Sequence, residues 1–81
     1  MKPKVTFIAP NNCSIKVGDD RYFQSYDSIC AKIDTHGNVT LYKDWNYRKT
    51  TLKYLKIFLN TSESKNEIQK KLDDGIYKKG L

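Results

Sequence analysis

A Cys–His nucleophilic pair is the first chemistry to consider, because the sequence contains two cysteines and one histidine. A thiol beside an imidazole becomes a nucleophilic thiolate, so Cys13 or Cys30 with His36 is the pair to consider. Cys30 falls in the middle of a predicted strand, however, and His36 lies in the turn that follows. The strand keeps these two groups apart, and Cys13 stands beside a different turn. We therefore interpret His36 as a solvated turn residue and assign no catalytic residue.

A metal or cofactor site is not encoded by these side chains either. Zinc requires several thiolates or imidazoles at short spacing, which one histidine and two distant cysteines do not provide. The acidic doublets Asp19-Asp20 and Asp73-Asp74 each adjoin a glycine, which is a composition typical of turns. No glycine-rich phosphate loop is present in the sequence. The sequence therefore predicts a protein that is not an enzyme and that carries no metal and no cofactor.

A row of lysines is the one charged pattern with a defined geometry. Lys49, Lys53 and Lys56 follow steps of four and three residues, so they share a stripe on a helix. Such a stripe fits a phosphate backbone or an acidic protein groove. A solvated helix face is the plain alternative, and we favour it for a chain this rich in lysine. The candidate binding residues are the stripe and its neighbours, namely Lys43, Arg48, Lys49, Lys53, Tyr54 and Lys56.

The length and charge of the chain limit the number of domains and the classes of partner. With 81 residues the chain has room for one core, so we expect a single domain over residues 1–81. Fifteen Lys and Arg against nine acids give a net charge of +6, which permits attraction to nucleic acid or to acidic proteins. The sequence has no apolar export segment and no run long enough to span a bilayer. We therefore expect a soluble, cytoplasmic protein with free thiols and no membrane partner.

The pattern of apolar residues predicts strands in the first half of the chain. A short apolar run at 5–8 and patterned runs at 13–17, 28–34 and 39–43 predict strands. Residues 21–24 form either a third strand or the start of a longer one. The runs at 28–34 and 39–43 form the clearest hairpin, and strict alternation places Ile29, Ala31 and Ile33 together on one face.

Helices are predicted in the second half. Apolar residues at steps of three and four predict an amphipathic helix over 47–59. A second helix follows, capped by Thr61 or Ser62 and stopped at Gly75. Trp45 stands between hairpin and helix, and we interpret it as a core anchor rather than an interface residue.

These elements predict an α+β fold. A small antiparallel sheet, made of the N-terminal strands and the central hairpin, carries two C-terminal helices packed on one face. Residues 78–81 are expected to form a frayed tail.

Several short motifs occur in a recognisable order along the chain, at 25–31, 37–41, 44–47, 50–54, 58–59, 67–71 and 75–77. They include a Ser-Tyr-Asp strand and a Trp-x-Tyr helix start followed by Thr-Thr. Through them the chain resembles a family of small uncharacterised proteins of bacteriophages and mobile elements, over roughly residues 22–78. The family usually has Ser where this chain has Arg48, which leaves Asn46 as the expected helix cap. We interpret the motifs as fold determinants, with Trp45 and Tyr47 stapling the helix onto the hairpin.

The resemblance and the small size together imply an accessory protein that binds and inhibits a host macromolecule. Its partner would be a host protein or a protein–nucleic acid complex in a bacterial host cell, such as a CRISPR effector or another defence component. Such a protein would be anti-CRISPR-like. The alternative is direct, non-specific binding of nucleic acid through the basic stripe. Edge strands pairing across a two-fold axis would give a homodimer, and the sequence leaves the oligomeric state open.

Overall fold

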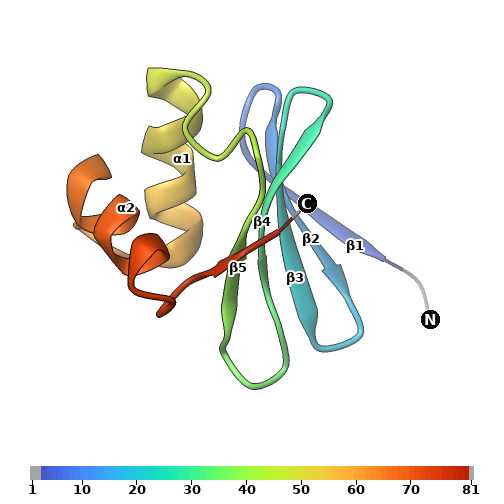
Figure 1. Ribbon diagram of the computed structural model, residues 1–81. Coiled ribbons are helices and arrows are strands. Elements are labelled where there is room, and N and C mark those ends of the chain that lie inside the picture. Colours follow the sequence, from blue (N-terminus) through green and yellow to red (C-terminus); the bar gives the residue numbers. More distant parts are fainter. Residues whose placement is uncertain (1–2, 81) are drawn as a thin grey trace.

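The structure, a computed structural model, describes residues 3–80. Six strands form one sheet in chain order, antiparallel from β1 to β5, and the short β6 joins β5 in parallel. Both helices cover the same face of this sheet (Figure 1). The α+β architecture predicted from the sequence is therefore confirmed. The elements are β1 (Lys4–Ala9), β2 (Asn12–Val17), β3 (Asp20–Ser25), β4 (Ser28–Ile33), β5 (Val39–Leu41), α1 (Lys49–Leu59), α2 (Lys65–Asp73) and β6 (Lys78–Lys79).

The hydrophobic core lies between the sheet and the helices. Phe23 from β3 stacks on Phe58 from α1, with 5.6 Å between the ring centroids. Leu55 from α1 and Ile68 from α2 join the same cluster and are fully buried. Removing this apolar surface from water is the main stabilising term, at about 25 cal/mol per Å². Trp45 is only 5% exposed within the cluster, which confirms its interpretation as a core anchor.

The central hairpin is confirmed, but a β-bulge changes which of its residues face the core. Ala31 pairs with Phe23 and Ile29 pairs with Gln24, so Cys30 is an extra residue between the two pairs. An extra residue interrupts the strict alternation of faces along a strand. Cys30 and Ala31 are both buried as a result, whereas Ile29 is 39% exposed. The prediction that Ile29 shares the core face with Ala31 is therefore wrong.

Helix α1 begins two residues later than predicted and has no side-chain cap. Arg48 is the N-cap residue in an extended conformation, and no side chain accepts a hydrogen bond from the first turn. The expectation that Asn46 caps this helix is therefore wrong. Tyr47 is 70% exposed and does not staple the helix onto the hairpin. The helix ends at Asn60, whose left-handed conformation lets its N–H bond to the Ile57 carbonyl.

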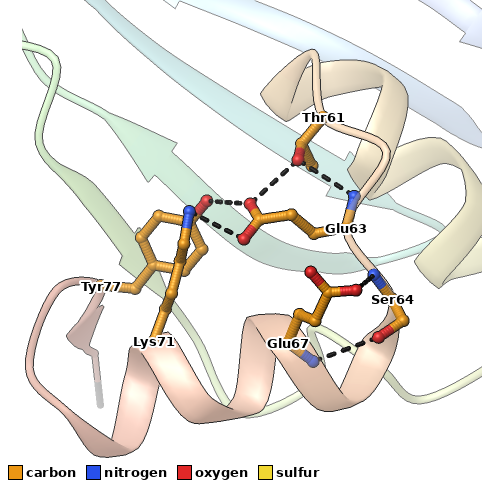
Figure 2. A network of polar contacts seen from close by, with 6 residues as sticks. All are labelled: Thr61, Glu63, Ser64, Glu67, Lys71 and Tyr77. Atoms are coloured by element: carbon orange, nitrogen blue, oxygen red, sulfur yellow. Dashed lines mark hydrogen bonds and ion pairs between the residues drawn. The ribbon is translucent and has the colours of Figure 1, made fainter.

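Helix α2 is capped by Ser64 rather than by Thr61 or Ser62. The Ser64 hydroxyl accepts from the Glu67 N–H at 3.2 Å, and the Glu67 carboxylate accepts from the Ser64 N–H at 3.4 Å (Figure 2). This reciprocal capping box satisfies two backbone donors at once, which explains why Ser64 is selected. Gly75 stops the helix as predicted, with a φ of 79° that few other residues adopt.

A polar network fixes the segment between the helices onto α2 (Figure 2). The Glu63 carboxylate accepts hydrogen bonds from the Thr61 and Tyr77 hydroxyls and lies 2.7 Å from the Lys71 ammonium. The hydrogen bond with Lys71 is the main cause that lowers the pKa of Glu63 below its usual range. The same pairing raises the pKa of Lys71, so both groups are charged at neutral pH.

The end of the chain is ordered beyond the point at which the sequence predicts fraying. Lys78 and Lys79 form β6 beside β5, and the Gly80 N–H donates to the Leu41 carbonyl at 2.8 Å. A Cβ at Gly80 would collide with the Tyr42 ring, so glycine allows this close approach. The frayed tail expected over 78–81 is thus not found at Lys78 or Lys79, and Leu81 lies outside the described residues. No helix within residues 3–80 has the length and apolar character needed to cross a membrane.

Candidate functional site

The predicted basic stripe lies on α1 and on the residue before it. Arg48 precedes the helix, and Lys49 and Lys53 are exposed along it. Lys56 is half-buried one turn further on. Tyr54 packs against the core and has the Lys53 ammonium 5.5 Å from its ring centroid. Helix geometry therefore brings the three lysines of the stripe together, and Tyr54 lies partly in the core.

Two further groups of cations lie away from α1. Lys43 lines a hollow of about 280 Å³ together with Trp45, Leu72 and Lys79, near the end of the chain. Strand register brings a second group together that the sequence analysis did not predict. It pairs Lys4 with Lys16 and Lys16 with Arg21, so three exposed cations lie side by side across β1, β2 and β3. We call Lys4, Lys16 and Arg21 the cross-strand cation row.

Arg48 is distinguished from the lysines of the stripe because its side chain lies against two aromatic rings. Its guanidinium lies 4.8 Å from the ring centroid of Tyr26 and 5.3 Å from that of Tyr47. Within residues 3–80, no carboxylate oxygen is within ion-pair distance of this guanidinium. Aromatic faces attract a guanidinium through its flat surface and leave its N–H edge available for other partners. The arrangement therefore presents an oriented cation between two exposed rings.

A cleft of about 360 Å³ opens beside these three residues. Its walls come from the β3–β4 turn, from β4, from the segment before α1 and from the first turn of α1. Two carboxylates, those of Asp27 and Asp44, line it along with the Arg48 guanidinium, so it offers both signs of charge. We call it the Tyr–Arg cleft, and its lining residues are Ser25, Tyr26, Asp27, Ser28, Cys30, Asp44, Tyr47, Arg48 and Thr51.

A buried chain of hydrogen bonds forms one wall of the cleft and fixes α1 relative to the sheet. The Ser25 hydroxyl donates to the Asn12 side-chain oxygen at 2.8 Å and lies 2.9 Å from the Thr51 hydroxyl. Because a hydroxyl has one proton, Thr51 is the donor in the second bond. All three residues are at most 3% exposed. The chain therefore links β2, β3 and α1 at the point where the cleft is formed.

The turn that carries Tyr26 is held in an uncommon conformation. Tyr26 has a φ of 56° and Asn11, in the neighbouring turn, a φ of 64°. A left-handed conformation costs a residue such as tyrosine about 1–2 kcal/mol. The Tyr26 N–H donates to the Asn11 carbonyl at 2.6 Å, which holds the two turns together. Backbone contacts therefore determine where the Tyr26 ring lies.

The thiol and imidazole groups do not form a reactive site in this arrangement. Burial raises the pKa of Cys30 to about 11, so its thiol is protonated at neutral pH and is a poor nucleophile. The Cys30 sulfur lies 3.6 Å from the Ser28 carbonyl oxygen and 3.5 Å from the Asp44 carbonyl oxygen, so its single proton is shared between two acceptors. His36 is exposed in the β4–β5 turn. Among residues 3–80, no three His, Cys, Asp or Glu side chains are grouped so as to hold a metal ion.

Sequence reasoning identified Arg48 but not the aromatic residues around it. Tyr26 and Tyr47 belong to the Ser-Tyr-Asp and Trp-x-Tyr motifs, so the motifs contained the signal. As linear motifs they predict fold determinants only, because a linear motif does not reveal that two segments 21 positions apart in the sequence meet at one cation.

Comparison with known proteins places the chain beside a family without an assigned role. The model of the Family of unknown function (DUF8033) matches residues 2–75. No curated protein and no solved structure matches the chain.

Proposed function

The chain belongs to the Family of unknown function (DUF8033), and we propose that it is a binding protein whose Tyr–Arg cleft receives a segment of another protein. The observation that carries this proposal is the Arg48 guanidinium between the rings of Tyr26 and Tyr47. Tyrosine and arginine supply most of the binding energy at many protein interfaces. Tyr47 is 70% exposed and Tyr26 43%, so both rings are available to a partner.

The mixed charge of the cleft favours protein over nucleic acid as its occupant. An acidic side chain of the partner would meet the free N–H edge of Arg48, where a two-pronged hydrogen bond forms. Asp27 and Asp44 would meet a basic or hydrogen-bond-donating group of the same partner. A phosphate backbone carries charge of one sign and would be repelled by these carboxylates.

Inhibition is the part of the proposal that comes from the resemblance to bacteriophage and mobile-element proteins. On this view the chain is a non-enzymatic accessory protein that covers a working surface of a host defence component, such as a CRISPR effector. The protonated Cys30 thiol supports a non-enzymatic role, because the cleft then holds no strong nucleophile.

Replacing Arg48 with alanine should remove the captured partner in a pull-down from a bacterial host lysate, quantified by mass spectrometry. The matched control is Lys65→Ala, which removes an exposed cation at the start of α2, outside the cleft. With the purified partner, Arg48→Ala should weaken binding by about tenfold to a hundredfold, the range of an interface hot spot. Capture that is equal for the wild type and Arg48→Ala would overturn the proposal. Addition of the wild type, but not of Arg48→Ala, should lower the activity of the captured complex.

Nucleic acid binding is a second candidate, favoured by the cross-strand cation row. Like charges placed directly opposite each other on neighbouring strands destabilise a sheet. Lys4, Lys16 and Arg21 repel one another in this way, and a phosphate backbone laid along the row would relieve the repulsion.

A salt series with fluorescently labelled DNA and RNA tests this candidate and locates the contact. Each neutralised phosphate on duplex DNA changes the slope of log K against log salt by about 0.9. If the cross-strand cation row binds the nucleic acid, the double variant Lys4→Gln/Lys16→Gln should flatten the slope by nearly two units. If the lysine stripe on α1 binds it instead, the double variant Lys49→Gln/Lys53→Gln should flatten the slope by the same amount. The control is Lys65→Gln/Lys70→Gln, which removes two exposed charges from α2. Absence of binding at low salt would exclude this candidate.

A further inference from the structure

The sheet has a second apolar face that the helices do not cover. Residues paired across antiparallel strands point to the same side, so the register defines two rows on this face. One row contains Phe7, Cys13, Gln24 and Ile29, and the other contains Val5, Ile15, Tyr22 and Lys32. The helices cover the opposite side of the sheet (Figure 1). Phe23 and Ala31 lie on that side, in the core cluster with residues of both helices. We call the uncovered side the outer face.

Over residues 4–7 of β1 and 12–17 of β2, the apolar residues lie on the outer face and the polar residues on the helix side, whereas Ile8 of β1 packs against the core. In β1 the polar residues Lys4 and Thr6 pair with Lys16 and Ser14 of β2, the residues whose side faces the helices. The apolar residues Val5 and Phe7 alternate with them and point the other way. An antiparallel sheet with one solvated face normally shows the reverse pattern, with apolar residues toward the core. The pattern of these two strands is that of a sheet covered on its outer face.

The outer face is exposed in the single chain. Phe7 is 77% exposed, Val5 50%, Val17 40% and Ile29 39%. These four residues come from β1, β2 and β4, and Tyr22 and Gln24 of β3 continue the same face between β2 and β4, so the four belong to one surface. Contiguous apolar surface of this kind marks an interaction site.

The charge of the outer face favours a second copy of this chain over an anionic partner. The chain carries a net charge of +6, so two copies repel each other wherever their cations meet. Where the two rows cross β1 to β4, the one charged side chain is Lys32, which lies 3.8 Å from the Asp20 carboxylate and above the Tyr22 ring, while Lys78 ends the second row on β6. An isologous contact brings the same patch from both copies together and therefore requires a patch without unbalanced charge. An anionic partner would have no electrostatic attraction to a patch of balanced charge and would bind to the basic surfaces instead.

We propose that two copies of this chain pack through their outer faces, with β1 and β2 of each copy at the centre of the contact. Two sheets packed in this way lie about 10 Å apart and interdigitate their apolar side chains. Phe7, the most exposed of the apolar residues at 77%, is the central anchor. This dimer leaves the Tyr–Arg cleft free, because the cleft lies at the start of α1 on the helix side of the sheet. The proposal therefore goes beyond the binding role of the cleft and fails or succeeds separately from it.

Sedimentation of the full chain over about 1 μM to 1 mM, the range of weak to moderate dissociation constants, tests the dimer. The wild type should approach twice the monomer mass of 9.5 kDa. Phe7→Lys should weaken self-association at least about tenfold, because it places like charges opposite each other. The matched control is Ile57→Lys, which adds the same charge at a residue 56% exposed on α1 and should leave the dimer intact.

Two results would overturn the proposal. One is a wild-type mass of 9.5 kDa over the whole range of concentration. The other is an equal weakening of self-association in Phe7→Lys and Ile57→Lys relative to the wild type, which would show that the added charge acts wherever it is placed. Circular dichroism verifies that each variant is folded, and Val17→Lys, on the same face of β2, replaces Phe7→Lys if that variant is not.

Discussion

Replacing Ile68 with alanine should lower the free energy of unfolding by about 2–5 kcal/mol, the usual range for a buried isoleucine. Ile68 is the one residue of α2 that is fully buried, at 0% exposure, and it joins the cluster formed by α1 and the sheet. Truncation removes its apolar contacts and leaves a cavity that the sheet and α1 are too tightly packed to fill. A domain of this size has a total stability of roughly 4–12 kcal/mol, so the variant should lose much of it.

The matched control for this prediction is Ile76→Ala. Ile76 lies just beyond the same helix but is 63% exposed, so the identical truncation should change stability by less than about 0.5 kcal/mol. Both variants are compared with the wild type by urea unfolding at one protein concentration, because self-association would add to the stability. Equal stabilities of Ile68→Ala and Ile76→Ala would show that α2 does not depend on its buried anchor.

Thr51→Val should destabilise the protein by about 1–3 kcal/mol although it preserves the shape of the side chain. Thr51 is 1% exposed and donates its hydroxyl proton to Ser25, whose own proton is engaged with Asn12. Valine removes that donor and leaves the Ser25 oxygen short of a partner in a buried position. The two residues have similar shapes and helix propensities, so the lost hydrogen bond dominates the difference.

Thr50→Val is the control, because Thr50 is the preceding residue of the same helical turn and is exposed. Its effect should stay within about 0.5 kcal/mol. Adding Ser25→Ala to Thr51→Val should cost less than the sum of the two single changes, because both then affect the same bond. If Thr51→Val and Thr50→Val unfold at the same urea concentration while Thr51→Val no longer binds the captured partner, Thr51 acts in recognition rather than in the fold.

Much of the architecture follows from local pattern. Alternation predicts the first five strands, and apolar steps of three and four predict both helices, because each repeat matches the geometry of its element. The stop at Gly75 was also predictable, since glycine readily adopts a left-handed conformation. The cap at Ser64 had a local signal too, in the Ser-x-x-Glu spacing to Glu67 that makes a capping box.

Long-range packing determines the β4 bulge, the cross-strand cation row and the Tyr–Arg cleft. The bulge at Cys30 turns Ile29 outward, and alternation within β4 contains no sign of it. Strand register sets Lys4, Lys16 and Arg21 in a row, although 12 and five positions separate them in the sequence. Tyr26 and Tyr47 meet at Arg48 only because α1 docks over the β3–β4 turn.

The orientation of β1 and β2 shows most clearly why local pattern predicts some features and long-range packing decides others. Alternation predicts that Val5 and Phe7 share one face, and they do. It does not state which side of the sheet the helices will cover, because that depends on where Phe23, Leu55 and Phe58 pack together. Periodicity is a property of neighbouring residues, whereas the choice of a buried face belongs to the whole folded chain. The exposed apolar surface at β1 and β2 is therefore visible only once α1 and α2 are in place.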